Sequence, residues 1–226
     1  MPVCKTFLHL ATLASALVLQ GCTSSGPGQN YWSQYWDLLG QAYRNSFSTQ
    51  SISLEQAAAI PYASLGYRID SGSQNLLVLA ADTNGDLLWT AASRVVLLTR
   101  GGRIIRTVNL PSDRAATTAQ NGAALPALAD ALKAPYRSTR LVDVPDIGAY
   151  GVALNCVTAA RRRELITILG TAIPTIRVDE TCSSTAPRWS FTDSYWIDPD
   201  SGFAWRSVQH LHSKARLEIE ILRPPE

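Results

Sequence analysis

The sequence predicts a mainly β protein, built as a curved antiparallel sheet or a partly open β-barrel with one or two N-terminal helices. Short apolar runs separated by turn residues recur from residue 76 to the C-terminus, a pattern typical of closely spaced strands. Extended helical spacing of apolar residues occurs only before Pro61. A hydrophobic content of 46% over 226 residues is enough for a core. We therefore expect one β-rich domain over residues 31–226.

The first 21 residues are interpreted as a lipoprotein signal peptide. Lys5 precedes an apolar run, Phe7–Leu19, and the small residue Gly21 is followed directly by Cys22. In such signals the cysteine thiol takes a diacylglycerol, the chain is cut before the cysteine, and the new amine is acylated. The alternatives are an ordinary signal with a chance cysteine or an uncleaved anchor. The run is shorter than the ~20 residues that a spanning helix needs, which favours the lipoprotein interpretation.

The lipid anchor on Cys22 sets the expected location and chemistry of the mature chain. Residues 22–30 form a short tether, and the acyl chains on Cys22 are the only bound groups expected, with no cofactor. Thr23 follows Cys22, whereas an aspartate there favours inner-membrane retention in enteric-type sorting, so we expect the outer membrane, with the domain facing the periplasm. Loss of Lys5 lowers the formal net charge from +2 to +1. This near-neutral balance argues against a nucleic-acid partner.

Two helices are expected before the strands begin. Asn30 can cap a helix over Tyr31–Phe47 whose aromatic residues gather on one face. That face either packs on the domain or binds the membrane surface or a partner. Ser53 and Gln56 have capping-box spacing at the start of a second helix, Ser53–Ile60, which Pro61 ends.

The first strands form a meander of hairpins. Leu76–Ala81 and Leu87–Ala91 flank a turn with the Asn-Gly hairpin signal at Asn84. Gly101-Gly102 forms the next turn, between Arg94–Arg100 and Arg103–Leu110.

The second half is irregular at first and then returns to strands. Residues 109–145 are rich in Ala, Thr and Pro, with a short helix expected over Leu128–Leu132. The turn Asp198–Gly202 joins the last hairpin. The expected strands are Gly148–Thr158, Leu165–Ile168, Thr175–Thr181, Trp189–Ile197, Phe203–Leu211 and Leu217–Leu222.

Cys156 and Cys182 are expected to form a disulfide. They remain after Cys4 is removed and Cys22 is acylated, and the expected compartment is oxidising. Two free buried thiols or a metal site are the alternatives. A metal site is disfavoured because no other Cys or His lies at ligand spacing from either residue.

Motifs for catalysis or metal binding are weak. The chain has no Gly-x-Ser-x-Gly elbow. His210 and His212 share a strand face and could begin a metal site, but no third ligand is identifiable, so a polar strand face is preferred. Carboxylates are present, and a spatially close pair for glycoside hydrolysis stays open because its separation is not a sequence property. They include Asp70, Asp143, Asp146, Asp179, Asp193 and Asp198. We predict no metal and no catalytic residue.

Aromatic residues of the last hairpins are the candidate contact site for a glycan or a partner protein. Tyr195 and Trp196 must point to opposite faces of their strand, so one face is core and the other could be a binding platform. Core packing and cross-strand pairing are the alternative. The candidates are Trp189, Tyr195, Trp196 and Trp205.

These segments resemble a known family. The resemblance is carried by Ile60-Pro61-Tyr62-Ala63-Ser64, by the strands up to Arg106-Thr107-Val108-Asn109-Leu110, and by Arg188-Trp189, Tyr195-Trp196-Ile197-Asp198 and Ser207-Val208-Gln209. Together they are similar to the YjbF/GfcB lipoproteins of exopolysaccharide and group 4 capsule operons, over roughly residues 53–222. The resemblance implies a β-rich accessory component of polysaccharide export at the outer membrane, beside a large β-barrel outer-membrane protein. It brings no catalytic residues.

The expected function is therefore that of a non-enzymatic outer-membrane lipoprotein that assists secretion or assembly of an extracellular or capsular polysaccharide. It would bind a β-barrel partner, the polysaccharide, or both. A periplasmic carbohydrate-active enzyme is one alternative, which a buried carboxylate pair in a long groove would favour. A lipid or lipoprotein carrier is another, which an apolar cavity lined by Leu, Val and Ile would favour.

Overall fold

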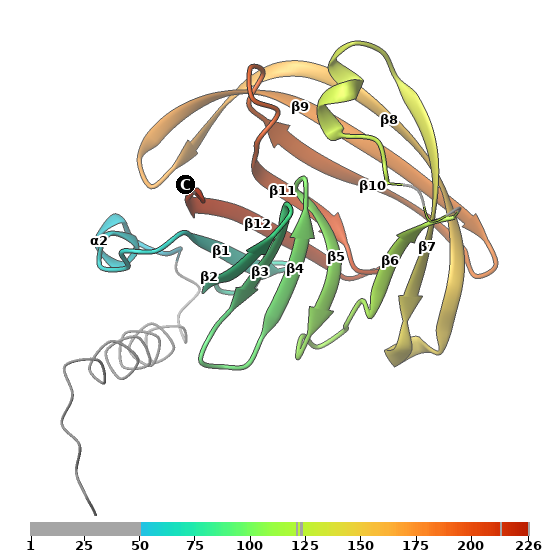
Figure 1. Ribbon diagram of the computed structural model, residues 1–226, viewed down its shortest axis with the longest axis horizontal. Helices are drawn as coiled ribbons and strands as arrows, with labels where there is room; N and C mark the ends of the chain where they lie inside the picture. The colour runs from blue at the N-terminus through green and yellow to red at the C-terminus, as the bar shows by residue number, and fades with distance from the viewer. Residues whose placement is uncertain (1–50, 121, 123, 213, 226) are drawn as a thin grey trace, which may run out of the picture.

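The computed structural model of the protein describes residues 51–120, 122, 124–212 and 214–225. The predicted signal peptide, Cys22, the tether 22–30 and the predicted helix Tyr31–Phe47 lie outside the described residues. Within them, the chain folds into one strongly curved antiparallel sheet that wraps into a nearly closed barrel (Figure 1). The prediction of a mainly β fold is confirmed.

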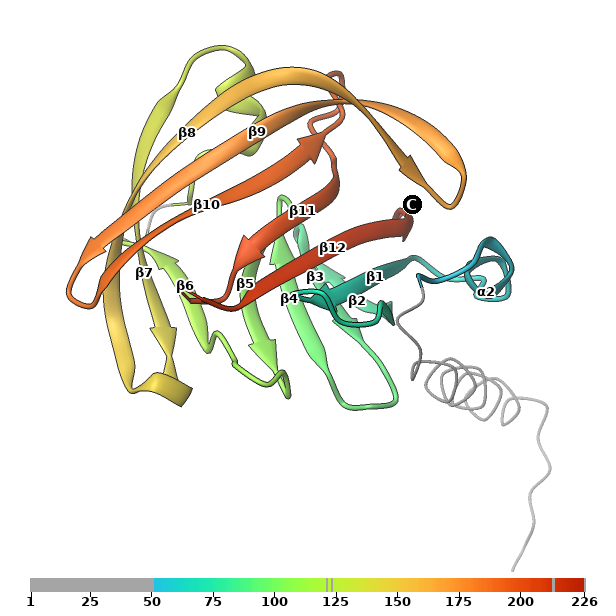
Figure 2. The same ribbon diagram turned by 180° about the vertical axis from the view of Figure 1, so that it is seen from behind.

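The sheet has 12 strands in the order β5-β4-β3-β2-β1-β12-β11-β10-β9-β8-β7-β6. Neighbours in the sheet are also neighbours in the chain, except that the first strand pairs with the last. The two edge strands, β5 and β6, come together where the barrel closes, and the backbone N–H of Thr107 donates to the carbonyl of Arg114 there (2.8 Å). Figure 2 shows the same curvature from behind, with β8, β9 and β10 arching over the barrel.

The first half contains the short helix α2 and the meander. The elements are α2 (Leu54–Ala58), β1 (Ser64–Ile69), β2 (Asn75–Thr83), β3 (Asp86–Thr90), β4 (Val96–Arg100) and β5 (Arg103–Val108).

The second half contains the long strands and two 3₁₀ turns. The elements are β6 (Ala116–Ala119), η1 (Leu128–Leu132), β7 (Tyr136–Val144), η2 (Pro145–Ile147), β8 (Ala149–Ile168), β9 (Thr171–Thr185), β10 (Arg188–Ile197), β11 (Ala204–His210) and β12 (Arg216–Arg223).

The predicted capping box begins α2. The N–H of Gln56 donates to Ser53 Oγ (3.1 Å), and the N–H of Ser53 donates to Gln56 Oε1 (2.8 Å), so two backbone donors at the helix start are satisfied. Ile60, just after the helix, packs with Leu76 and Val78 of β2. This contact places α2 against the outside of the sheet.

The hairpin turns use residues that tolerate positive φ. Asn84 and Gly85 have φ of 54° and 84°, as the Asn-Gly signal predicted. Gly102, with φ of 82°, has a second constraint, because a Cβ there would lie 2.5 Å from the Cβ of Ala204. The β4–β5 turn therefore packs directly on the start of β11 and needs glycine.

Some predicted strand boundaries were wrong. The predicted strands Gly148–Thr158 and Leu165–Ile168 fall in one 20-residue strand, β8, which begins at Ala149 and has a register shift between Ala160 and Arg163. This bulge contains three exposed arginines, residues 161–163. Because they interrupt the pattern of apolar residues, the sequence did not predict one continuous strand. The strands β1, β6 and β7 were not predicted. In β7 the buried Arg140 faces the interior beside Val142 and Val144, so a charged residue interrupts the apolar side of the strand.

The core has an apolar part and a polar part. The largest apolar cluster lies between β1–β5 and β11–β12 and includes Trp89, Leu97 and Leu217, all fully buried. The short η1 turn closes another part of the core, with Leu128 and Ala131 packed near Tyr195. Charged side chains occupy the interior between β5, β7, β9 and β10. In the described residues no helix is long and apolar enough to cross a membrane.

Candidate functional site

The four candidate aromatics do not form one surface. Trp189 and Tyr195 point into the barrel and are 6% and 0% exposed. Trp205 is half-buried and packs edge-on against Phe203 at the apolar core (5.1 Å between ring centroids). Trp196 alone points to the outer face of the sheet. A role in glycan or partner contact therefore rests on Trp196 among these four.

The indole of Trp196 is held between two guanidinium groups. Arg177 on β9 and Arg206 on β11 are its register neighbours, and their Cζ atoms lie 5.6 Å and 5.8 Å from the ring centroid. The indole Nε1 donates to Glu164 Oε2 (2.6 Å). Because cations and a carboxylate already contact the ring and its N–H, Trp196 is poorly placed as an open stacking platform.

Charge pairs extend this row along the outer face. Arg206 Nε donates to Glu220 Oε1 (2.8 Å), and the amide of Gln74 donates to Glu220 Oε2 (2.8 Å). The Gln74 side chain crosses over Gly66, where a Cβ would lie 2.5 Å from its Nε2. The side chains on this part of the outer face are thus largely engaged with one another.

Two carboxylates on this face, Glu164 and Asp179, have pKa values below their ordinary values. The hydrogen bond from Trp196 holds the pKa of Glu164 below its ordinary value, with help from Arg162. Burial tends to raise the pKa of Asp179, but hydrogen bonds from Arg177 and Ser194 outweigh it and lower the pKa. These groups therefore act as fixed anions that hold the arginines.

Trp196→Ala is expected to lower the free energy of unfolding by about 1–2 kcal/mol, because it removes two partly exposed cation–π contacts. Thermal and denaturant melts of the purified protein would measure the change. Arg163→Ala is the matched control: Arg163 is exposed, so its loss should cost within about 0.5 kcal/mol. Equal free energies of unfolding for the two variants would contradict a structural role for the Trp196 ring.

The barrel interior contains a buried ion network centred on Glu180. Arg140 Nη1 donates to Glu180 Oε2 (2.7 Å), and Arg103 Nη2 donates to Glu180 Oε1 (3.0 Å). The hydroxyl of Thr158 donates to the same Oε1 (3.1 Å). Arg140 and Glu180 are each 1% exposed. These contacts join β5, β7, β8 and β9 through one carboxylate.

A second buried carboxylate extends the network to β10 and β11. Arg140 Nη2 donates to Asp193 Oδ2 (3.1 Å), and the backbone N–H of His210 donates to Asp193 Oδ1 (2.8 Å). The Tyr195 hydroxyl donates to Gln209 Oε1 (3.2 Å), which also accepts the backbone N–H of Ile104 (2.9 Å). The network thus connects both halves of the barrel.

Ion pairing within the network keeps Glu180 ionised despite its burial. Burial alone would raise the pKa of Glu180, but Arg140 and Arg103 outweigh it and lower the pKa to about 2. Burial raises the pKa of Tyr195 well above its ordinary value. A carboxylate with so low a pKa cannot serve as a general acid near neutral pH.

Cys156 and Cys182 are joined by a disulfide between directly opposed residues of β8 and β9. Both are almost fully buried, and Arg140 Nη2 lies 3.5 Å from Cys182 Sγ. The two sulfurs and a Glu180 oxygen lie within 4.8 Å of one another. The disulfide leaves no thiolate to bind a metal there.

His210 and His212 have different surroundings. His210 Nδ1 lies 3.0 Å from Asp193 Oδ1, and its ring stacks on Phe191 (4.9 Å between centroids). His212 follows β11, and its Nδ1 accepts the N–H of Lys214 (3.3 Å). Burial lowers the pKa of His212. The two rings are therefore held by separate partners.

Sequence reasoning missed the buried network. It noted Asp193 only as one of several acids, and it did not single out Arg140 or Glu180. A usable signal was the position of Glu180 between Val178 and Cys182, and of Asp193 between Phe191 and Tyr195. A charged residue in register with apolar residues at i−2 and i+2 indicates a buried ion.

Comparisons with known proteins agree with the fold. A curated relative, the uncharacterized lipoprotein GfcB of Escherichia coli (strain K12), is 25% identical over 214 residues, which is 92% of this chain and 95% of the relative. The crystal structure of the hypothetical lipoprotein YmcC from Escherichia coli (K12) matches with a TM-score of 0.68 and 23% identity. That match covers 83% of this chain and 95% of the solved chain, and it supports the fold alone.

A family model matches residues 39–222, from within the predicted helix Tyr31–Phe47 to Leu222 in β12. Its description is "Group 4 capsule polysaccharide lipoprotein gfcB, YjbF". The resemblance seen in the sequence is confirmed over a longer stretch than the motifs alone covered. The chain belongs to the YjbF family of group 4 capsule polysaccharide lipoproteins.

Proposed function

We propose that this protein is a non-enzymatic lipoprotein, anchored through Cys22 in the outer membrane, that assists secretion or assembly of a capsular or extracellular polysaccharide from the periplasmic side. The observation that carries the proposal is the family match over residues 39–222 together with the lipoprotein signal before Cys22. A β-barrel outer-membrane protein is the proposed partner, and the polysaccharide is a second ligand.

The polar interior favours this role over that of a lipid carrier. A carrier needs an apolar cavity for an acyl chain. Here Arg103, Arg140 and Glu180 fill the interior between β5, β7 and β9 and are bound to one another. An acyl chain placed here would separate these ions from one another and offer them no hydrogen bonds. Leaving buried ions unpaired in this way costs free energy.

The state of the buried carboxylates favours a non-enzymatic role. Glycoside hydrolysis needs one carboxyl group with a raised pKa to protonate the leaving group. The pKa of Glu180 is lowered to about 2, and the carboxylate is held by two arginines. Asp193, 0% exposed, is likewise held by Arg140 and His210. Both groups support the barrel from within.

A strain that lacks the gene, complemented by wild type or by Cys22→Ala, tests the proposal. The null strain is expected to lose most of its cell-surface polysaccharide while polymer accumulates inside the envelope. Wild type should restore surface polymer, incorporate labelled palmitate and fractionate with the outer membrane. Cys22→Ala should do none of these, because it lacks the thiol that accepts the diacylglycerol and two or three acyl chains are needed for stable anchoring.

The controls separate anchoring from function. Cys22→Ala must be present at wild-type abundance, and its unprocessed or released form should be visible by size. Normal surface polysaccharide in the null strain would overturn the proposed function. Equal palmitate incorporation into wild type and Cys22→Ala would overturn the lipid anchor. Cross-linking in intact cells, followed by identification of co-purified β-barrel proteins, tests the proposed partner.

A further inference from the structure

One part of the outer face differs sharply from the Trp196 row. It lies on residues 137–139 of β7, 155–157 of β8, 181–185 of β9 and 188–192 of β10, which are paired in continuous register. Among the described residues on this face of these segments, none is acidic. The face is named here the hydroxyl face after the side chains Thr139, Thr181, Ser183, Thr185, Ser190 and Thr192.

Most side chains of the hydroxyl face are open to solvent and keep hydrogen-bonding capacity. Thr181, Ser183, Thr185 and Ser190 are all exposed. Thr181 and Thr192 share one hydrogen bond across strands (3.1 Å). A hydroxyl can donate one hydrogen bond and accept two, so even these paired groups keep free positions. Such a surface offers a regular array of donors and acceptors to a polyhydroxylated ligand.

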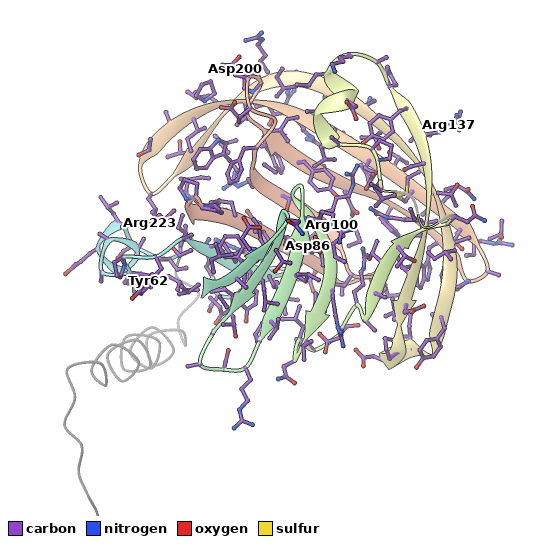
Figure 3. All side chains as sticks on the ribbon, in the orientation of Figure 1. Tyr62, Asp86, Arg100, Arg137, Asp200 and Arg223 are labelled. Atoms are coloured by element: carbon purple, nitrogen blue, oxygen red, sulfur yellow. A yellow bond between two sulfur atoms is a disulfide. The ribbon has the colours of Figure 1, made fainter. Side chains whose placement is uncertain are left out.

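Two arginines stand at opposite corners of this array. Arg137 lies on β7 in the row that contains Thr181 and Thr192, and Arg188 lies at the start of β10, four residues before Thr192. Both are exposed, and within the described part of the chain neither has an ion pair or a side-chain hydrogen bond. Figure 3 shows Arg137 projecting away from the barrel.

Carboxylates that border the face are already engaged. Asp179 accepts hydrogen bonds from Arg177, Arg161 and Ser194. Asp143, at the other end of β7, accepts the backbone N–H of Gly151 (2.6 Å). The two free guanidinium groups therefore have no anionic partner within the face, which leaves it with a net positive charge.

The separation of the arginines selects for an extended ligand. Three strand spacings and four residues of strand rise place their Cα atoms roughly 20 Å apart. A single sugar cannot reach both, whereas a polymer lying across β7–β10 can contact both and the hydroxyls between them. Guanidinium groups bind carboxylates in a forked geometry that suits uronate-type sugars.

We infer that the hydroxyl face, with Arg137 and Arg188, binds an extended acidic polysaccharide, with the arginines on its carboxylates and the Thr and Ser hydroxyls on its sugar hydroxyls. This inference rests on the proposed function and names the ligand class and the surface. The proposed recognition surface is thus an acid-free part of the sheet, in place of the aromatic residues of the last hairpins.

The test uses the mature full-length lipoprotein in detergent and affinity electrophoresis through gels that contain polygalacturonate. Carboxyl-reduced polygalacturonate of the same length is the uncharged control polymer. The wild-type protein should be retarded by polygalacturonate and not by the reduced polymer. Arg137→Ala/Arg188→Ala should weaken binding about tenfold, from two partly solvated ion pairs lost together. Ser183→Asp, which adds an anion between them, should weaken it by a similar factor.

Arg106→Ala/Arg223→Ala is the matched control, because it removes two exposed arginines from other strands and the same total charge. This double variant should bind polygalacturonate with the same affinity as wild type. All variants should have the same melting temperature as wild type. The inference is overturned if polygalacturonate does not retard the wild-type protein, or if the carboxyl-reduced polymer retards it equally. It is also overturned if the two double variants weaken binding to polygalacturonate by the same factor. Loss of surface polysaccharide in the null strain alongside any of these results would leave the proposed function standing and remove only this site.

Discussion

Arg140→Ala is expected to destabilise the protein by about 3–5 kcal/mol, which is a large part of the stability of a typical domain. Arg140 is 1% exposed and donates to both buried carboxylates, Glu180 and Asp193. Its removal leaves Glu180 with Arg103 and the Thr158 hydroxyl, and it takes from Asp193 the arginine that contacts it, while both carboxylates remain away from water. Denaturant unfolding followed by circular dichroism would measure the loss.

Arg137→Ala is the control for this prediction, because Arg137 lies three residues earlier on the same strand but points to solvent. It should change the free energy of unfolding by no more than about 0.5 kcal/mol. If Arg140→Ala unfolds at the same denaturant concentration as Arg137→Ala, the buried ion network contributes little to the free energy of unfolding, which contradicts the prediction.

The same network predicts an acid limit for stability. The folded-state pKa of Glu180, about 2, lies below its ordinary value of 4.5, so the folded state binds the proton less readily than the unfolded chain. The resulting stabilisation is fully present above pH 4.5 and is lost as the pH falls toward 2. Glu180→Gln should flatten this part of the stability curve, as measured by melts between pH 5 and pH 2.

Replacing Cys156 and Cys182 together by serine is expected to cost about 3 kcal/mol. In the chain-entropy model, a disulfide between residues 26 apart restricts the unfolded chain by about this amount. The two residues are directly opposed on β8 and β9, so the folded strands can keep their pairing without the bond. Unfolding of the double variant against wild type, both without reductant, gives the difference.

Reductant provides the internal control. Wild type unfolded in the presence of dithiothreitol should approach the double variant, whereas the variant itself should be insensitive. Thiol alkylation of denatured, unreduced mature protein should modify neither Cys156 nor Cys182. Modification of both would mean that the bond is absent, and the stability difference would then need another cause.

Turn chemistry made much of the fold predictable from sequence. Asn84-Gly85, Gly101-Gly102 and Asp198–Gly202 each require particular backbone angles or side-chain hydrogen bonds, so the hairpins around them were placed correctly. The strand β7 was missed because Arg140 interrupts the apolar alternation that Val142 and Val144 continue. The partners of this buried arginine lie 40 and 53 residues further along the chain. Such long-range pairing leaves no local periodicity to read.

The candidate site was harder to predict for the same reason. Clustered aromatics in the last hairpins drew attention to Tyr195 and Trp205, yet strand alternation and the bulge near Trp196 turn them toward the core. The hydroxyl face has no sequence motif, because its residues are distributed over four strands. They come together on one surface only when the strands pair in register. What identifies it is the lack of acids, which appears once the faces of the strands are known.

The pairing of β1 with β12 has a consequence for the order in which the chain can fold. The N-terminal strands are synthesised first, so the meander β1–β5 can assemble before the rest of the chain is available. The open edge of β1 must nevertheless wait for the final strand, Arg216–Arg223, before it is covered. An exposed edge is a template for pairing with other chains, so a chain that lacks its last strand is prone to aggregation. The final eight residues of the sheet therefore protect its first strand from intermolecular pairing.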